Sequence, residues 1–367
     1  MKHRLQFIEI AALIYFIVRS SYIGIGIDCY LHYGKVDGYL SILIGSIIGI
    51  IPLLLILKIS NINRDKNINQ MLETLMGKTI GKIFSILLLG FTFFYATVMF
   101  YDLINFIASE YLYKTPYVLI GIMIIIPIIY VLTKGLKTIC RTCLILFILS
   151  IILYLFSIIG LIPNFSFNKM LPFLENGISG PFIGAFHHIA YAILPLLTLT
   201  IIPRKDFEGD KKNDKRIILT HTISVILIFI SLCNVIGVLG IDLALLYQYP
   251  DYHMLRRIQV GGFIQRTESI LAIQWLLCLF VMIVFCMYYC LKTTSFLLPK
   301  WKSKNDRILQ LLFPIGMLIL SRNLFQNNTS FVSFTIYSFP IYIYVFFLGI
   351  PIIIYIVYLI KKLQKKM

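Results

Sequence analysis

Apolar stretches of about twenty residues recur along the whole chain, and they restrict its possible folds more than any other feature. Hydrophobic residues make up 59% of the 367 positions and charged residues only 13%. The polar runs between these stretches have the length of loops, so we expect a single domain over 1–367. The sequence predicts an all-α polytopic membrane protein with about ten transmembrane helices. Their approximate positions are 5–31, 37–58, 79–109, 115–133, 138–162, 178–203, 216–246, 268–292, 306–323 and 336–360.

Basic residues are distributed unevenly between the two sides of this arrangement. With the N-terminus inside the cell, most of the 33 Lys and Arg residues fall in cytoplasmic loops. Such an excess is typical of the cytoplasmic side of membrane proteins. The pattern predicts that both termini are cytoplasmic. The net charge of +17 is then explained by basic cytoplasmic loops that orient the protein in the bilayer. Because no nucleic acid is needed to explain this charge, we expect no nucleic-acid partner.

The middle of the first span has an unusual composition for a membrane helix. A lipid-exposed helix would contain only apolar residues there, but the stretch 15–28 includes Arg19, Ser20, Ser21, Gly24 and Gly26. Glycine weakens a helix, and irregular backbone at membrane depth is tolerated only where it faces protein or a wet cavity. We therefore expect the first helix to be broken and to face a solute, as in transporters whose half-helices line a central site.

The sixth span carries a similar set of helix-weakening residues. It contains Gly180, Pro181, Gly184 and Pro195, so the first span of each half is interrupted. This predicts a 5+5 inverted repeat, with halves at approximately 5–162 and 178–360 and with helices one and six broken. His187 and His188 lie near the predicted midplane of this span. One of them can bind a solute or titrate, or it can be held by a carbonyl freed at the break.

Three further spans or connections contain polar candidates. Tyr95 and Asp102 lie on nearby turns of the third span; Asp102 is either the partner of buried Arg19 or a solvated residue near the outer interface. Gln274 lies deeper in the eighth span and is a pore-lining candidate. The aromatic connection 243–267 is a candidate lid or re-entrant helix, and Ile68–Lys78 is expected to form a short amphipathic helix on the cytoplasmic side.

Signatures of enzymes and of metal sites are missing from the sequence. It has no Gly-x-Ser-x-Gly, His-Glu-x-x-His, phosphate-loop or dinucleotide pattern. The seven cysteines are scattered and lack nearby His or acidic partners, which favours buried structural thiols over a metal site. We expect no enzyme activity, no cofactor and no bound metal.

Several short motifs in this order resemble one family of membrane proteins. They are Gln6-Phe7, the run from Arg19 to Gly26, the run from Gly38 to Gly49, Thr115-Pro116, the run from Gly135 to Arg141, Leu171-Pro172-Phe173, and Arg266-Thr267-Glu268 before Trp275. Together they cover nearly the whole chain. The sequence resembles the spore-germination B subunit (GerAB-type) family, a branch of the amino acid/polyamine/organocation permeases.

The resemblance implies a LeuT-like fold with a solute pocket between spans one, three, six and eight. It implies a small germinant such as an amino acid, and a complex with an A subunit and a C-type lipoprotein in the spore inner membrane. The matching positions place Ser20, Ser21, Gly24 and Gly26 at the first break and His187, His188 and Tyr191 on the side of the sixth span. Arg19 departs from the small residue common in the family. This argues against an ordinary zwitterionic ligand or indicates that Arg19 meets a carboxylate.

An alternative function remains open at this point. The same pocket would serve a proton- or cation-coupled amino acid transporter in a bacterial plasma membrane, with Asp102 or a histidine titrating during transport. Sensing and transport need the same features in the sequence, so the sequence alone does not separate them.

Overall fold

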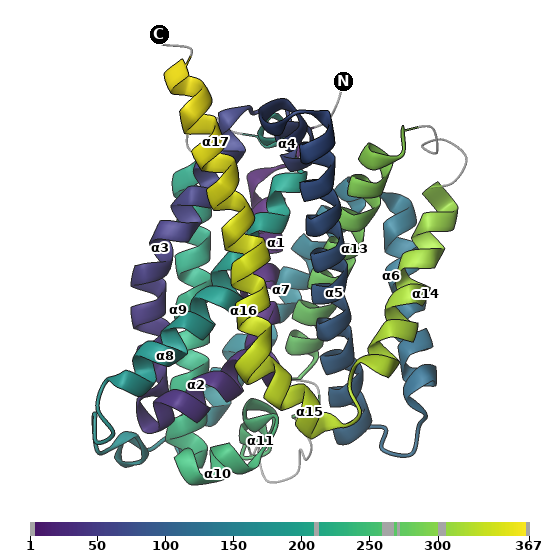
Figure 1. Cartoon of the computed structure of the whole chain (residues 1–367). Coiled ribbons are helices and arrows are strands. Elements are labelled where there is room, and N and C mark those ends of the chain that lie inside the picture. Colours follow the sequence, from purple (N-terminus) through teal and green to yellow (C-terminus); the bar gives the residue numbers. More distant parts are fainter. Residues whose placement is uncertain (1–3, 209–212, 259–267, 270–271, 300–305, 365–367) are drawn as a thin grey trace.

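The computed structural model describes residues 4–208, 213–258, 268–269, 272–299 and 306–364. Within these ranges the regular secondary structure is entirely helical, apart from one isolated β-bridge between Leu5 and Phe207. Most helices run lengthwise through one bundle, and both ends of the chain lie at the same end of it (Figure 1). This confirms the predicted all-α membrane class.

Nine helical segments within the described residues are long and apolar enough to cross a membrane. The first of them, Phe7–Ile62, has 56 residues and contains both of the first two predicted spans. Inside it the chain reverses at a 3-10 turn, Lys35–Asp37, after which α3 (Gly38–Ile62) packs against α2 (Ile27–Gly34). The number ten and the inverted repeat stay predictions.

The remaining long helices follow the predicted spans closely. They are α5 (Lys78–Glu110), α6 (Tyr117–Lys134), α7 (Leu136–Leu161), α9 (Asn213–Leu239), α13 (Ile273–Leu297) and α14 (Asp306–Leu324). The last segment combines α15 (Asn328–Ser333), a π turn (Phe334–Ser338), α16 (Phe339–Ile343), a second π turn (Tyr344–Gly349) and α17 (Ile350–Gln364). The two π turns were not predicted; Pro340, Gly349 and Pro351 are the helix-weakening residues near them.

The predicted amphipathic helix is present as α4 (Ile68–Met76). Asn67 caps its first turn by accepting a hydrogen bond from the Gln70 backbone N–H at 3.0 Å. Its apolar face is buried and packs against α5. The helix therefore packs its apolar face against the bundle.

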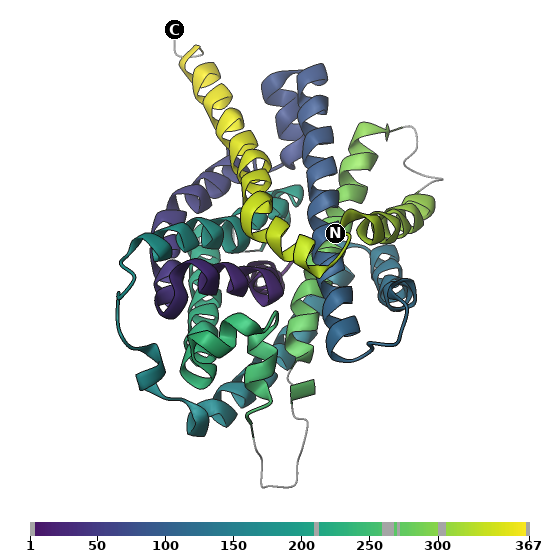
Figure 2. The ribbon, with the colours of Figure 1, turned by 60° about the horizontal axis from the view of Figure 1, so that its bottom comes forward.

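Both predicted helix interruptions are present. The helix α1 (Phe7–Ser20) ends in a π segment (Tyr22–Gly26) before α2 begins. The helix α8 (Ser179–His188) passes into a π segment (Ile189–Ile193) and then a 3-10 helix (Leu194–Ile201). The two π segments contact each other. The predicted broken helices are thus confirmed, and their breaks meet inside the bundle, where Figure 2 shows α1 and α2 surrounded by other helices.

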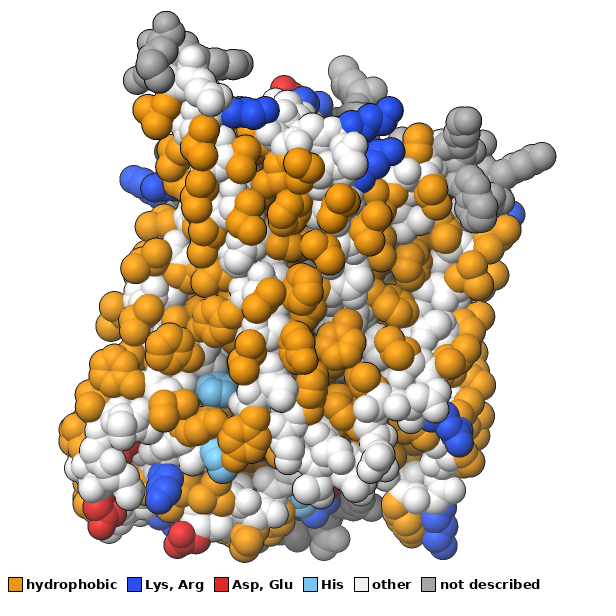
Figure 3. All heavy atoms as spheres, viewed as in Figure 1, with side chains coloured by type: hydrophobic (Ala, Val, Ile, Leu, Met, Phe, Trp, Pro, Cys, Tyr) orange, Lys and Arg blue, Asp and Glu red, His pale blue; other side chains and the backbone are white. Residues whose placement is uncertain are grey.

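The surface of the bundle is consistent with a membrane environment. Exposed Ile, Leu and Phe side chains cover the long helices, and Figure 3 shows them as a broad apolar zone. Many Lys and Arg side chains in this view gather above that zone, near the end that carries both termini.

Candidate functional site

The first break brings the backbone directly against an acidic side chain. Gly24 has a φ of +66°, which residues with a side chain rarely adopt. A Cβ atom at this position would lie 2.7 Å from Asp102 Oδ1 and 2.6 Å from the Tyr249 ring. Only glycine fits here without displacing a neighbour. The bare backbone of the break therefore lines the same space as the Asp102 carboxylate.

Asp102 itself is completely buried in α5. Its Oδ1 atom accepts a hydrogen bond from the Tyr249 hydroxyl at 3.3 Å. Its Oδ2 atom has no hydrogen-bond partner. Burying a carboxylate without compensation is costly, so this oxygen favours a proton or a cationic group. Of the two predicted alternatives for Asp102, the solvated position at the outer interface does not agree with this burial.

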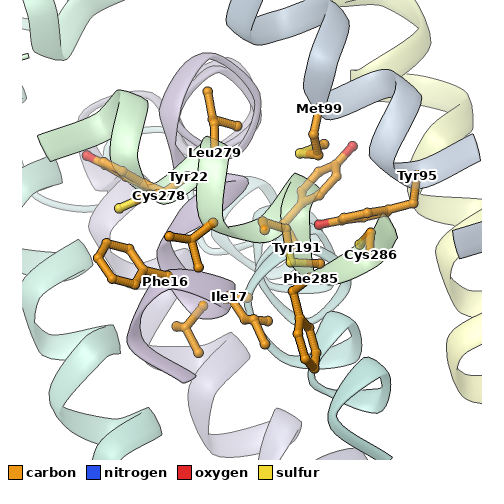
Figure 4. Close-up of a cluster of buried hydrophobic side chains, with 14 of the residues drawn as sticks. Phe16, Ile17, Tyr22, Tyr95, Met99, Tyr191, Cys278, Leu279, Phe285 and Cys286 are labelled. Atoms are coloured by element: carbon orange, nitrogen blue, oxygen red, sulfur yellow. The ribbon is translucent and has the colours of Figure 1, made fainter. Parts of the chain in front are cut away.

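Ser21 and Tyr95 connect the first break to α5. The Ser21 hydroxyl lies 2.5 Å from the Tyr95 hydroxyl and 3.6 Å from the sulfur of Met99. Figure 4 shows Tyr95, Met99 and Tyr191 close together in a cluster of buried side chains. The neighbouring predicted residues have local roles: the Ser20 hydroxyl donates to the Ile17 carbonyl at 2.9 Å, and the Gly26 N–H donates to the Ser21 carbonyl at 2.8 Å.

His188 in the sixth span is enclosed by two hydroxyl groups. Its Nδ1 lies 3.1 Å from the Tyr30 hydroxyl, and its Nε2 lies 3.1 Å from the Ser46 hydroxyl. Both ring nitrogens therefore have partners in α2 and α3. The ring is fully buried between these helices and helps to hold α8 against them.

His187 and Tyr191 bind backbone carbonyls instead. His187 Nδ1 lies 3.0 Å from the Ile183 carbonyl, and Nε2 lies 2.9 Å from the Ile336 carbonyl. The Tyr191 hydroxyl donates to the Thr335 carbonyl. Thr335 and Ile336 belong to the first π turn of the last span. A backbone carbonyl was one of the predicted partners for a histidine. The sequence analysis did not predict that the last span would supply one of these carbonyls.

Arg19 is not hydrogen-bonded to Asp102, whose Oδ2 atom has no partner and whose Oδ1 atom accepts from Tyr249. Its guanidinium stacks on the rings of Tyr15 and Tyr154, 5.2 and 4.5 Å from their centroids. The Nε and Nη1 atoms have no hydrogen-bond partner, although the residue is only 1% exposed. Its acidic neighbour is Asp251 in α11 (Pro250–Leu255), with which it interacts electrostatically. The expectation that Arg19 meets a carboxylate thus points to the outer connection rather than to Asp102.

A small cavity of about 20 Å³ lies beside Asp251. Both Asp251 oxygens are buried without a side-chain hydrogen-bond partner, and burial raises the pKa of this carboxyl to about 7. Gln274 lines the same cavity; its amide donates to the Ser157 hydroxyl at 3.3 Å, and its oxygen has no partner. The cavity has room for about one water molecule. Gln274 therefore faces this pocket.

The outer connection covers the first break. Within the predicted lid 243–267, residues 259–267 lie outside the described part, while α10 (Ile241–Leu246) and α11 are present. Between these helices, Tyr249 is buried against Asp102 and Gly24. The described portion of this connection therefore closes the break from one side.

An amide network above Tyr249 was not anticipated from the sequence. Asn105 donates to the Tyr249 hydroxyl at 2.9 Å and to Asn328 Oδ1 at 3.0 Å. Gln248 and Asn328 exchange two hydrogen bonds, of 2.8 and 2.5 Å. Beyond them lies a cavity of about 300 Å³ that Asp28, His32, Gln248 and Asn328 help to line. The only sequence signal was the polar, aromatic composition around Gln248.

Among the described residues, no group of three or more His, Cys, Asp or Glu side chains is arranged to hold a metal ion. The first break offers a carboxyl oxygen without a partner, two hydroxyls bonded to each other, and a buried backbone that carries no side chain at Gly24. The sixth break offers side chains that already have partners.

Comparisons with known proteins agree with this architecture. The curated relatives include spore germination protein KB of Bacillus subtilis, 23% identical over 90% of this chain and 88% of that protein. They also include the putative spore germination protein YfkT of the same organism, 26% identical over 90% and 89%. Spore germination protein XB of Bacillus anthracis is 24% identical over 69% of this chain and 70% of that protein.

A solved structure has a similar fold. The crystal structure of a manganese transporter mutant from Eremococcus coleocola superposes with a TM-score of 0.56 at 12% identity, covering 92% of this chain and 77% of that one. At this identity the likeness concerns the fold alone, which is transporter-like. The family model described as spore germination protein matches residues 8–332. The chain therefore belongs to the spore germination protein family of membrane permeases.

Proposed function

We propose that this chain is the B-type membrane subunit of a spore germinant receptor and binds a small solute, an amino acid or a similar molecule, at the first helix break. Family membership and the transporter-like fold support the receptor role. One observation carries the binding role: Asp102 has a buried oxygen without a partner and lies against the bare backbone of Gly24. A ligand ammonium group would pair with this oxygen.

The side chains around Asp102 would complete the pocket. Ser21 and Tyr95, now bonded to each other, would exchange that bond for contacts with the ligand. His187, His188 and Tyr191 would form the wall on the side of the sixth span. The outer cavity near Gln248 and Asn328 would be the entrance, and the amide network with Tyr249 would have to open for the ligand to reach Asp102.

The proposal also includes the partner subunits, the membrane and the orientation of this chain. We infer an A-type subunit and a C-type lipoprotein as partners and the spore inner membrane as the location. The end that carries both termini would face the cytoplasm, because the basic side chains gather near it in the view of Figure 3.

A thermal-shift experiment tests the binding site. The detergent-purified protein is screened against free amino acids, and the best ligand is tested on Asp102→Asn and, as a control with the same charge change, on the exposed Asp242→Asn. A bound ligand should stabilise the native protein by about 2.7 kcal/mol at a hundredfold excess over its Kd. The shift should disappear in Asp102→Asn and remain in Asp242→Asn. An unchanged shift in Asp102→Asn would place the ligand elsewhere.

A proton- or cation-coupled amino acid transporter is the second candidate. The observation in its favour is the buried acid Asp102 within a fold similar to that of a transporter. It predicts that proteoliposomes accumulate the ligand under an imposed proton gradient and lose it when the gradient collapses. Flat uptake, together with ligand binding, would leave the receptor role.

A further inference from the structure

Two adjoining cavities lie on the side of the last helix, near the end that carries both termini. Each has a volume of about 460 Å³. They share Ile62, Tyr358 and Lys362, so they form one groove between α3, α4 and α17. The helix α17 packs against both α3 and α4. We call this depression the α17 groove.

Basic side chains dominate the polar lining of the α17 groove. Lys58 and Lys362 line one cavity, and Lys66, Lys361 and Lys362 line the other. Lys58 Nζ lies 5.8 Å from the centre of the ring of Tyr355, which lines the same cavity. The groove therefore carries a concentrated positive charge.

The single acidic residue among those lining the two cavities is already neutralised. Asp214 accepts a hydrogen bond from Arg204 at 2.9 Å through Oδ1 and one from Asn61 at 2.7 Å through Oδ2. Asp214 is therefore paired with these two residues and not with the lysines of the groove. The groove consequently lacks an internal counter-charge and fits a negatively charged ligand.

The rest of the groove lining is apolar and continues into the lipid-facing surface. Leu54 and Leu359 line one cavity, and both side chains are about two-fifths exposed (39% and 41%). Further from this end, Ile51 on α3 and Ile356 on α17 are 73% and 50% exposed. Tyr355 and Tyr358 line the same cavity as Lys58 and Lys362. Aromatic residues next to basic ones are typical of the membrane–water interface.

We propose that the α17 groove binds an anionic phospholipid. The phosphate would lie between Lys58 and Lys362, and one acyl chain would follow Leu54 and Leu359 down the outside of the bundle. Basic pockets between transmembrane helices suit anionic headgroups, and the apolar continuation of the groove suits a chain that a soluble anion lacks. This inference is independent of the solute site.

The test measures lipid binding to the full-length protein in a neutral detergent. Native mass spectrometry records the bound lipid during titration with dioleoyl phosphatidylglycerol and, separately, with dioleoyl phosphatidylcholine. The wild type should retain the anionic lipid in preference. The double variant Lys58→Gln/Lys362→Gln should bind it about thirtyfold more weakly, since each lysine near an anionic headgroup contributes on the order of a fivefold gain in affinity.

A matched control removes two lysines elsewhere. Lys134, which also lies over a tyrosine ring, and Lys137 are changed to Gln together, and this variant should bind the anionic lipid like the wild type. Equal loss in both double variants would reduce the effect to net charge and overturn the proposal. Equal retention of both lipids, or competition by inorganic phosphate alone at the lipid concentration, would also overturn it.

Discussion

The two helix breaks are both π segments, but their polar groups differ in how completely they are hydrogen-bonded. At the sixth break, His188 has a hydroxyl partner at each ring nitrogen, and both nitrogens of His187 lie within 3.0 Å of backbone carbonyls, to one of which a neutral imidazole donates. At the first break, Asp102 keeps an unbonded oxygen, and nearby on the first span Arg19 keeps two unbonded nitrogens. The sixth break is therefore held in place by its polar groups, whereas the first has bonding capacity left for a ligand or a proton. Polar residues at membrane depth identify both helix breaks as candidate sites. Their atoms without hydrogen-bond partners identify the first break as the one able to bind a ligand.

The largest effect is expected from Gly24→Ala. The new Cβ would lie 2.6–2.7 Å from Tyr249 and Asp102, at a backbone angle that disfavours any side chain. Strain and overpacking together should cost about 3 kcal/mol or more of folding stability. Gly90→Ala is the control, because a Cβ there would meet nothing within 4 Å. Thermal unfolding in detergent measures both. Equal midpoints for the two variants would show that the first break is looser than this packing indicates.

The variant His188→Ala tests whether the sixth break contributes to stability rather than to ligand binding. It removes the partners of the Tyr30 and Ser46 hydroxyls and leaves a cavity, which should cost about 2–4 kcal/mol of stability. Ligand affinity should change less than it does in Asp102→Asn. The exposed His32→Ala serves as the control, with an expected loss of about 0.5 kcal/mol or less. Full stability combined with lost ligand binding would reverse the roles assigned to the two breaks.

The last effect, the smallest per unit of change, is a dependence of stability on pH through Asp251. Its pKa in the folded protein is raised to about 7 from an ordinary value of 3.8, so the folded state holds the proton more tightly than the unfolded state. Stability should be highest below pH 3.8 on account of this group. It should fall as the pH rises toward 7, by at most about 1.4 kcal/mol per pH unit.

Unfolding midpoints of wild type and Asp251→Asn, measured from pH 5 to 8, provide the check. The substitution should remove this part of the slope, and Asp242→Asn should leave it in place. A slope identical in wild type and Asp251→Asn would mean that the charge of Arg19 holds Asp251 ionised throughout this range.

The spans and their interruptions could be predicted because each depends on residues close in sequence. Long apolar runs must be helical in a bilayer, and Gly24, Gly26 and Pro195 weaken a helix wherever it packs. The partners could not be predicted, because they depend on how distant spans meet. Arg19 lies near Asp251, which follows more than two hundred residues later, and no pattern in the sequence links the two. His187 binds a backbone carbonyl, which every residue offers and which therefore leaves no trace in the composition.

The π turns of the last segment have a consequence for the opposite end of the molecule. Each π turn holds about one residue more than an α turn, which rotates everything beyond it by roughly 100° about the helix axis. His187 and Tyr191 form hydrogen bonds to carbonyls of the first such turn and so stabilise the extra residue at that position. These contacts with the sixth span therefore determine the rotation of α17 about its axis. That rotation in turn decides which way Tyr358 and Lys362 point. If the first π turn relaxed to α-helix while the start of the last segment stayed in place, Tyr358 and Lys362 would turn by roughly 100° about the helix axis, away from α3 and α4.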